Sequence, residues 1–178
     1  MQRFTRQRNE RGQGVPFFID KNSMILRKTI ESAIDNYLKE SDLFLVDIVI
    51  SSDNDIEITI DSFNGIGIDN CTGISRLVEA SFDREEEDFS LTVTSAGLDQ
   101  PFKVARQYEK FTGKEVEVLF KSGVKLIATL AEYKDESLRL TYSGLEKVEG
   151  KKRKIKVEHD EWHALETIKT TKPFINFK

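Results

Sequence analysis

Cysteine is almost absent from this chain of 178 residues, in which Cys71 is the only thiol. A single cysteine excludes an internal disulfide. Together with the presence of only two histidines, it also excludes the zinc-ribbon and zinc-finger classes, which need several Cys or His ligands. A chain without disulfides suits a reducing compartment, so the sequence predicts a cytoplasmic protein.

Long hydrophobic runs are absent as well. The longest run, Leu43–Ile50, is interrupted by Asp47 and falls far short of the roughly 20 apolar residues that a membrane-spanning helix needs. The N-terminal stretch is polar and rich in arginine and has no apolar core, so it does not resemble a signal peptide. Residues 1–22 show no periodicity and contain helix-breaking glycines and a proline, which predicts a disordered extension.

Charge is present in abundance but is unevenly distributed, and the net value of −4 conceals this. Residues 24–103 hold six Lys and Arg against seventeen Asp and Glu, whereas residues 104–178 hold sixteen against twelve. An acidic half joined to a basic half indicates two partners of opposite charge, or one mixed assembly of protein and RNA. Acidic residues can also serve only to keep a small domain soluble, and composition leaves both interpretations open.

The pattern of residues 23–101 predicts a small α+β domain. Apolar residues spaced three and four apart predict one helix from Ser23, as N-cap, to about residue 40 and another from Asp69, as N-cap, to about residue 83. Dense or alternating apolar residues predict strands at residues 43–51, 56–60 and 89–95. The order helix–strand–strand–helix–strand predicts two helices on one face of a three-stranded sheet.

Residues 102–178 predict a second domain made of short strands. A helical turn or two at residues 104–111 comes first and ends at Gly113. Five strands are expected at residues 114–120, 125–133, 137–142, 153–157 and 165–168, the last open to continuation as far as residue 177. Short strands at regular intervals favour a small barrel or sandwich, and a segment of this size suits an SH3-like or Sm-like β-barrel.

A loop with a glycine and a terminal proline separates the two predicted domains, and it consists of Ser95, Ala96, Gly97, Leu98, Asp99, Gln100 and Pro101. Residues 93–101 read V-T-S-A-G-L-D-Q-P and resemble the V-S-S-P-G-L-D-R-P segment of the bacterial ribosome maturation factor RimP family. Three other segments also resemble motifs of that family and occur in the same order. They are I-E-I-T-I-D at residues 56–61, G-I-G-I-D-N-C at 65–71 and G-K-E-V-E-V at 113–118.

Two residues of this loop depart from the family pattern. Ala96 stands where the family usually has proline, and Gln100 stands where it usually has arginine. The loop therefore lacks a fixed φ at position 96, and it lacks a cation at position 100 that could bind phosphate or carboxylate. The fold expectation survives both changes, whereas the expectation of a decisive charged contact from this loop is weakened.

The resemblance implies a cytoplasmic assembly factor without catalysis or cofactor. Members of the RimP family bind the small (30S) ribosomal subunit during its maturation, and the resemblance points to the small-subunit protein numbered twelve and to small-subunit rRNA as partners. It implies an acidic α+β domain rigidly coupled to a basic barrel, and we expect a monomer.

An alternative is an Sm-like RNA-binding regulator that never engages the ribosome. A hydrolase would need a convergent polar pocket, for which the sequence offers no residues.

Clustered cations are the strongest electrostatic feature of the predicted barrel, and they are Lys121, Lys125, Lys151, Lys152, Arg153 and Lys154. Such a cluster can neutralise phosphates and gives affinity without reading the base sequence, so we expect it to contact rRNA. The alternative is a charged hairpin that keeps an edge strand from aggregating. No aromatic pattern typical of base-specific RNA recognition accompanies these cations.

An acidic run in the first predicted domain is a candidate contact for a basic ribosomal protein, and it consists of Glu85, Glu86, Glu87 and Asp88. Opposite charge would steer and hold a cationic partner at this run. The alternative is a solvated loop whose charge has no partner. Sequence alone does not decide between the two.

Residue types that often carry catalysis have no supporting pattern here. His159 and His163 lie four apart, as on a metal-binding helix, but no third strong ligand accompanies them, and we expect no metal. Cys71 extends an apolar helical stripe, which favours a packed side chain over a reactive thiol. Asp99 is expected to hydrogen-bond its own turn, and Gly97 lacks the flanking residues of a phosphate-binding loop.

Overall fold

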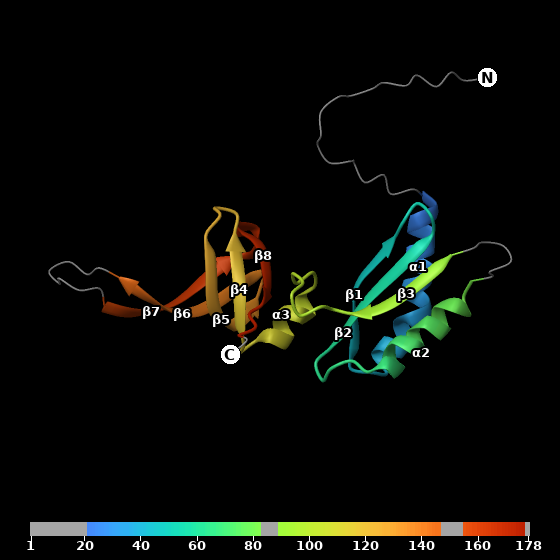
Figure 1. Cartoon of the computed structure of the whole chain (residues 1–178), viewed down its shortest axis with the longest axis horizontal. Helices are drawn as coiled ribbons and strands as arrows, with labels where there is room; N and C mark the ends of the chain where they lie inside the picture. Colours follow the sequence, from blue (N-terminus) through green and yellow to red (C-terminus); the bar gives the residue numbers. More distant parts are fainter. Residues whose placement is uncertain (1–20, 83–88, 147–154, 177–178) are drawn as a thin grey trace, which may run out of the picture.

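The structure is a computed structural model that describes residues 21–82, 89–146 and 155–176. Its described part contains two separate β-sheets and three α-helices, which confirms the α+β class (Figure 1). None of the described helices is long and apolar enough to cross a membrane. The Glu85–Asp88 run and the Lys151–Lys154 cluster lie outside the described residues.

The first sheet has three strands, in the order β1-β2-β3. Its elements along the chain are α1 (Lys21–Lys39), β1 (Leu43–Ile50), β2 (Asp55–Ser62), α2 (Ile68–Glu79) and β3 (Ser90–Ser95). Strands β1 and β2 form an antiparallel hairpin, whereas β3 pairs with β2 in parallel after the chain has crossed over through α2. Both helices lie on the same side of this sheet (Figure 1).

An isoleucine-rich core holds α1 and α2 against the first sheet. Alternate residues of β2, Ile56, Ile58 and Ile60, are buried in this core together with Ile30 and Ile34 of α1 and others from α2 and the neighbouring strands. Because side chains alternate along a strand, the polar residues between these isoleucines face the opposite side of the sheet. That opposite side is where the rest of the molecule makes contact.

A β-bulge in β1 changes which residues face that open side. The register shifts between Leu45, which pairs with Ile60, and Asp47, which pairs with Thr59, so that Val46 is an extra residue in β1. Without the bulge, Leu45 and Asp47 would face the same side, since side chains two apart in a regular strand do. The bulge therefore directs Asp47 to the open face while Leu45 packs against the isoleucine-rich core.

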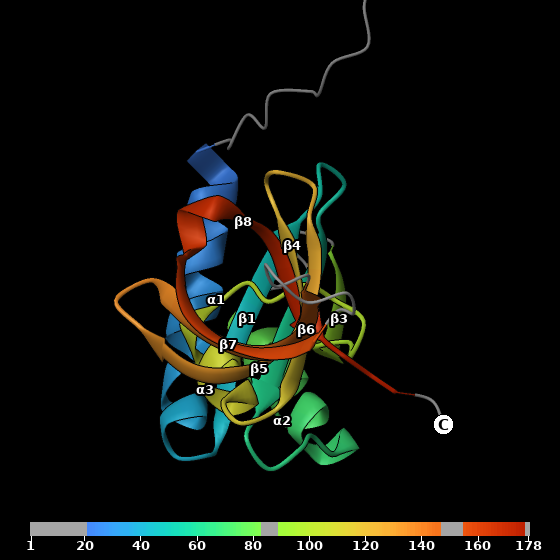
Figure 2. The same cartoon turned by 90° about the vertical axis from the view of Figure 1, so that its left-hand side faces the viewer.

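The second sheet has five antiparallel strands, in the order β7-β6-β5-β4-β8. Its elements follow α3 (Ala105–Phe111) and are β4 (Glu115–Phe120), β5 (Lys125–Lys134), β6 (Ser137–Glu146), β7 (Ile155–Ala164), the 3₁₀ turn η1 (Leu165–Thr167) and β8 (Ile168–Pro173). Strands β6 and β7 project away from the rest of the molecule (Figure 1), and the sheet is strongly curved when viewed from its own end (Figure 2).

A closed barrel is not confirmed, because β7 and β8 are the two edges of an open sheet among the described strands. The predicted strand at residues 165–168 is wrong in its first three residues, which form η1, and β8 starts at Ile168. Strand β7 continues through His159 and His163 to Ala164, beyond the predicted end at residue 157. Antiparallel pairing with β6 along its whole length stabilises this extension.

The helix starts differ from the predicted ones by a few residues. Helix α1 already begins at Lys21, so Ser23 lies inside it and is not its N-cap. Helix α2 begins at Ile68 with Gly67 as its N-cap, and the side chain of Asn70 accepts a hydrogen bond of 2.9 Å from the Gly67 N–H. Asp69 therefore lies in the first turn, where its charge interacts favourably with the helix dipole.

Candidate functional site

The two sheets meet through a short stretch that begins at the loop from Ser95 to Pro101. The Ala96 N–H donates a hydrogen bond of 2.9 Å to the carbonyl of Ile60, which continues the parallel pairing of β2 and β3 by one residue. The Gln100 N–H then donates to the Gly97 carbonyl at 3.1 Å and closes a turn. The loop is therefore ordered by its backbone at both ends.

Gly97 does not adopt a positive φ, in contrast to Gly65, Gly113 and Gly123. A Cβ at position 97 would lie 3.0 Å from Asp99 Oδ1 and 3.1 Å from Gln100 Cγ, both of which are side-chain atoms. The glycine thus allows a close approach and does not serve a left-handed backbone conformation.

The two departures from the family pattern leave this loop with few side-chain bonds. The Gln100 side chain makes one long hydrogen bond, of 3.4 Å, to Asp99 Oδ1. That contact takes the place of the expected bond from Asp99 to its own turn. Leu98 is 62% exposed, so the tip of the loop is free to contact a partner.

Helix α3 lies between the two sheets and is anchored to the second one by aromatic side chains. The rings of Phe102 and Tyr108 have their centroids 5.1 Å apart, and Tyr108 stacks on Tyr133 of β5 at the same centroid distance. The Phe102 N–H also donates a hydrogen bond of 2.8 Å to the Thr171 carbonyl of β8. These contacts make α3 part of the second sheet's core.

The opposite side of α3 carries cations that reach the open face of the first sheet. Lys110 Nζ lies 2.6 Å from Asp61 Oδ1 of β2, and both side chains are largely buried, at 17% and 9% exposure. Arg106 lies over the rings of Phe44 and Phe63, at 5.4 and 5.8 Å from their centroids. Cation–π contacts of this kind hold a guanidinium without a carboxylate partner.

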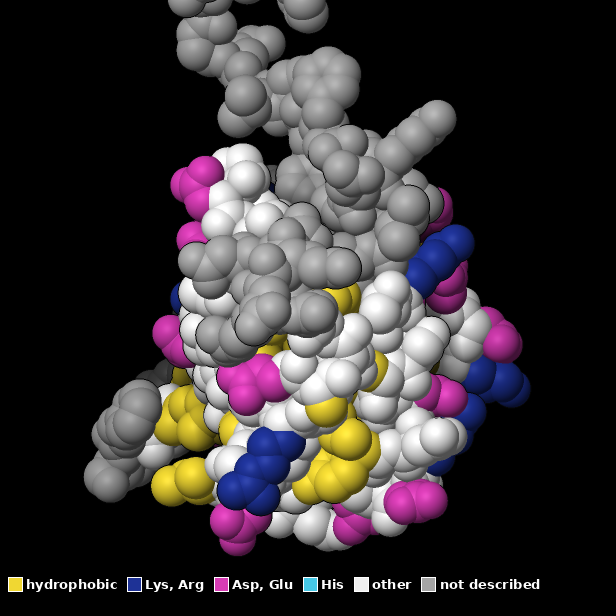
Figure 3. Space-filling model, turned by 90° about the vertical axis from the view of Figure 1, so that its right-hand side faces the viewer, with side chains coloured by type: hydrophobic (Ala, Val, Ile, Leu, Met, Phe, Trp, Pro, Cys, Tyr) yellow, Lys and Arg dark blue, Asp and Glu magenta, His cyan; other side chains and the backbone are white. Residues whose placement is uncertain are grey.

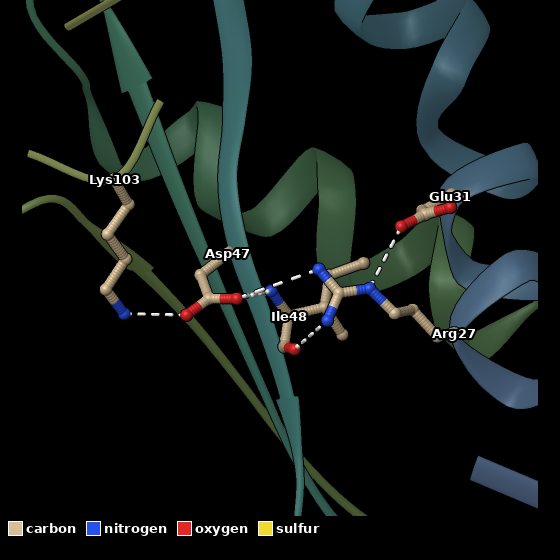
Figure 4. A network of polar contacts seen from close by, with 5 residues as sticks. All are labelled: Arg27, Glu31, Asp47, Ile48 and Lys103. Atoms are coloured by element: carbon tan, nitrogen blue, oxygen red, sulfur yellow. Dashed lines mark hydrogen bonds and ion pairs between the residues drawn. The ribbon is translucent and has the colours of Figure 1, made fainter. Parts of the chain in front are cut away.

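Asp47 forms the third contact between the two halves (Figure 4). Its Oδ2 lies 2.6 Å from Lys103 Nζ, and its Oδ1 lies 3.7 Å from Arg27 Nη2, while Arg27 also donates to the Ile48 carbonyl at 3.0 Å and pairs with Glu31. Burial raises the pKa of Asp47, but the hydrogen bond and charge of Lys103, the Ile48 N–H and the Arg27 charge outweigh it and lower the net pKa.

Together these three cations form what we call the junction: Lys103, Arg106 and Lys110 with their partners Asp47, Phe44, Phe63 and Asp61. Sequence reasoning missed the junction. The spacing of four residues between Arg106 and Lys110 was a visible sign that these two share one face of a helix, whereas Lys103 lies just before α3. Their partners lie in β1, in β2 and, for Phe63, directly after β2, far earlier in the chain, and no local pattern connects them.

Of the predicted phosphate-contacting residues, the structure places Lys121 and Lys125 at the turn between β4 and β5. Gly123, with a φ of +88°, forms this turn. Lys125 pairs with Glu117 at 2.7 Å, and Lys172 approaches the same carboxylate at 3.5 Å, so that the hydrogen bond from Lys125 in particular lowers the pKa of Glu117. Lys121 is exposed and has no ion pair within the described part of the chain.

The remaining candidates behave as ordinary structural residues. His159 and His163 lie on one face of β7 with Glu161 between them. The Glu161 carboxylate oxygens lie 3.5 Å from His159 Nδ1 and 3.6 Å from His163 Nε2, so the helical face considered for the two histidines is wrong. Within the described residues no group of three or more His, Cys, Asp or Glu side chains could hold a metal ion. Cys71 is half-buried and packs against the isoleucine-rich core, as expected.

The face of the first half that points away from the second sheet shows carboxylates and cations interspersed over its described surface (Figure 3). Described side chains of one sign do not gather into a single patch in this view. The acidic composition of this half is therefore not concentrated here.

Comparison with known proteins connects this arrangement to one family. The model of the RimP N-terminal domain matches residues 33–99, which end inside the loop that follows β3. A ribosome maturation factor RimP of Porphyromonas gingivalis is 38% identical over 131 residues, which cover 74% of this chain and 86% of that protein. The chain belongs to the RimP family.

Other RimP proteins match over similar lengths. That of Flavobacterium psychrophilum is 35% identical over 147 residues, covering 82% of this chain and 94% of that protein. That of Christiangramia forsetii is 34% identical over 137 residues, covering 76% and 89%. Because these matches extend well beyond residue 99, the similarity to RimP includes part of the second sheet as well as the first.

Proposed function

We propose that this chain is a cytoplasmic ribosome maturation factor that binds the small (30S) ribosomal subunit during assembly, without catalysis. Membership of the RimP family carries this proposal, since the relatives are named for ribosome maturation. A family shares its binding role more reliably when the similarity spans most of both chains, as it does here.

We further propose that residues 23–101 and residues 102–178 form two domains that bind different partners. The acidic first domain would hold a basic ribosomal protein, the small-subunit protein numbered twelve, with a contribution from Glu85–Asp88. The second domain would be an open relative of the small SH3-like or Sm-like barrels and would contact rRNA phosphates. The separation of the two hydrophobic cores, which share no residue, supports a division into two domains.

The rRNA contact would come from Lys121 and from Lys151, Lys152, Arg153 and Lys154. The latter four belong to the connection between β6 and β7, the two strands that project from the molecule (Figure 1). Lys125 would contribute less, because its ammonium group is already paired with Glu117. A cation that already pairs with a carboxylate loses that ion pair when it neutralises a phosphate, and so it contributes less to affinity.

Sedimentation through a sucrose gradient tests the proposal. We expect the protein to co-migrate with free small subunits and not with translating ribosomes. If it stays at the top of the gradient at low salt while binding naked RNA, the maturation role is rejected and the Sm-like RNA regulator takes its place.

A triple variant, Lys152→Glu, Arg153→Glu and Lys154→Glu, tests the rRNA contact. We expect weaker subunit binding and a salt slope that is less steep by roughly 0.7–0.9 for each lost phosphate contact. The matched control is Lys28→Glu, Lys39→Glu and Arg76→Glu, which makes the same change in charge at exposed positions on α1 and α2. Equal slopes for the two variants would show that the cluster is only a solvated hairpin.

A further inference from the structure

Trp162, the only tryptophan of the chain, is 50% exposed on the outer face of β7. Directly across from it on β6 lies Arg139. Strand β7 is an edge strand, with β6 as its only partner among the described strands. A large apolar side chain that stays exposed beside an unpaired strand edge is typical of a docking surface.

The surroundings of Trp162 are acidic, although the second half of the chain has an excess of cations. Arg139 is neutralised by Asp160, which accepts hydrogen bonds of 2.7 and 2.6 Å from Nε and Nη2. Glu132 approaches Arg139 from the other side, at 4.0 Å. Since one guanidinium faces two carboxylates, this part of the outer face keeps an excess of negative charge.

Further carboxylates lie at the end of β7 beyond Trp162. The Glu136 carbonyl accepts a hydrogen bond of 2.8 Å from the Leu165 N–H, which brings the turn between β5 and β6 against η1. Glu136 and Glu166 are exposed on these two segments, and the exposed residues Lys134, Asp135 and Lys169 lie within three positions of them in the chain, so carboxylates outnumber cations there. A phosphate backbone would be repelled at this corner, whereas a cationic segment would be attracted.

We propose that Trp162 and the edge of β7 form a docking surface for an extended arginine- or lysine-rich segment of a ribosomal protein, an inference that rests on the proposed function. The segment pairs with the free edge of β7 as an added strand. One of its cations lies over the Trp162 indole, where the carboxylates of this part of the outer face, Asp160, Glu132 and Glu166 among them, attract positive charge. Such a surface would add a protein contact to residues 102–178, whose excess of cations predicts an RNA contact.

The same charges disfavour two other occupants. A second copy of this chain would bring a second acidic corner against the first, and like charges repel at a strand edge. An RNA strand would meet carboxylates where it needs cations. Both remain measurable outcomes of the test below.

The test uses the full chain and the fluorescence of its single tryptophan. The probes are a peptide of alternating arginine and threonine, the corresponding glutamate–threonine peptide, and a single-stranded oligouridylate. We expect the arginine peptide alone to change the Trp162 emission and to slow amide hydrogen exchange in β7. Equal binding by either other probe, or no binding by the arginine peptide up to ~1 mM, would overturn the inference.

Variants locate the contact. Trp162→Ala should weaken binding of a labelled arginine peptide about tenfold or more, as expected for an interfacial tryptophan. Leu145→Ala is the matched control, because Leu145 is a more exposed apolar side chain, 69% exposed, on neighbouring β6. Glu132→Gln combined with Glu166→Gln should weaken binding and reduce its salt dependence. Equal affinities for all these variants would overturn the inference.

Sedimentation of the wild type and Trp162→Ala with small subunits separates this inference from the proposed function. If the wild type does not co-migrate with subunits, the proposed function fails. If the wild type co-migrates but Trp162→Ala does so equally and the arginine peptide does not bind, the docking surface alone fails. We expect the wild type to co-migrate and the variant to bind more weakly.

Discussion

The first and second sheets both contact α3, but they do so through different kinds of side chain. The second sheet packs aromatic rings against it, with Tyr108 stacked on Tyr133. The first sheet instead contacts the cations of α3 through carboxylates and the faces of aromatic rings, Asp61 and Phe44 among them. Apolar packing makes α3 part of the second sheet's core, whereas polar contacts attach it to the first without merging the two cores.

This difference teaches how the charge asymmetry of the chain is used. Residues 23–101 supply Asp47 and Asp61, and the chain after Pro101 supplies Lys103 and Lys110, so part of the opposite charge is neutralised inside the molecule. Composition therefore overstates the charge that each half can offer to a partner. The same is true at Glu117, which occupies Lys125.

The largest expected effects come from breaking one core at a time. Ile58→Ala in the first core or Leu140→Ala in the second should each cost about 2–5 kcal/mol, because both side chains are fully buried. Hydrogen exchange should show lost protection only in the half that carries the change. If both halves lose protection together, the molecule unfolds as one unit and the contrast between the sheets is wrong.

A smaller effect is expected at the most buried pair of the junction. Asp61→Asn should cost about 1–3 kcal/mol, because it leaves the Lys110 ammonium group poorly solvated and without a counter-ion. Glu57→Gln, an exposed change on the same strand, is the control. Urea denaturation measures the stability, and small-angle X-ray scattering should show a broader range of distances between the halves for Asp61→Asn only.

The Asp47 contact should depend on pH. Its pKa in the folded protein is lowered, so its stabilising contribution is complete above the unfolded-state pKa of about 4 and is lost as the pH falls through the lower folded pKa. Asp47→Asn should therefore be less stable than the wild type near neutral pH, by under about 1 kcal/mol because Lys103 is exposed, and the difference should shrink in acid. A difference in unfolding free energy that does not change with pH would contradict this.

The smallest effect is expected at Gly97. Because its φ is not positive, Gly97→Ala should change stability by about 0.5 kcal/mol or less, with Asp99 and Gln100 shifting their exposed side chains. Gly113→Ala, at a φ of +81°, is the strained comparison and should cost more. Equal costs would show that the loop after β3 is stiffer than its contacts suggest.

Much of the fold follows from local patterns in the sequence. The alternation of Ile56, Ile58 and Ile60 predicts both β2 and its buried face, and all three side chains are fully buried. The spacing of apolar residues likewise predicts the order of the helices and strands along the chain. Strand β7 was predicted too short, because the residues after Val157 are mostly polar and gain their strand conformation from pairing with β6.

The junction could be predicted only in part, for a physical reason. The spacing of Arg106 and Lys110 places them on one face of α3, and a sequence pattern can show that, whereas Lys103 precedes the helix. Their partners are fixed by the crossover through α2 and by the chain direction after Ser95, and these are properties of the whole fold. Trp162 is a similar case, since its exposure depends on β7 being an edge.

The bulge at Val46 accommodates one extra residue in β1 without turning Asp47 away from the open face. Because Val46 is the extra residue, Leu45 and Asp47 pair with the adjacent residues Ile60 and Thr59 and point to opposite sides of the sheet, although they are two apart in the chain. A strand that ran regularly through Val46 would turn Val46 toward Lys103 and Asp47 toward the isoleucine-rich core. A relative that lacks this residue keeps Asp47 on the open face in a regular strand, so the bulge is what allows the longer β1 to make the same contact.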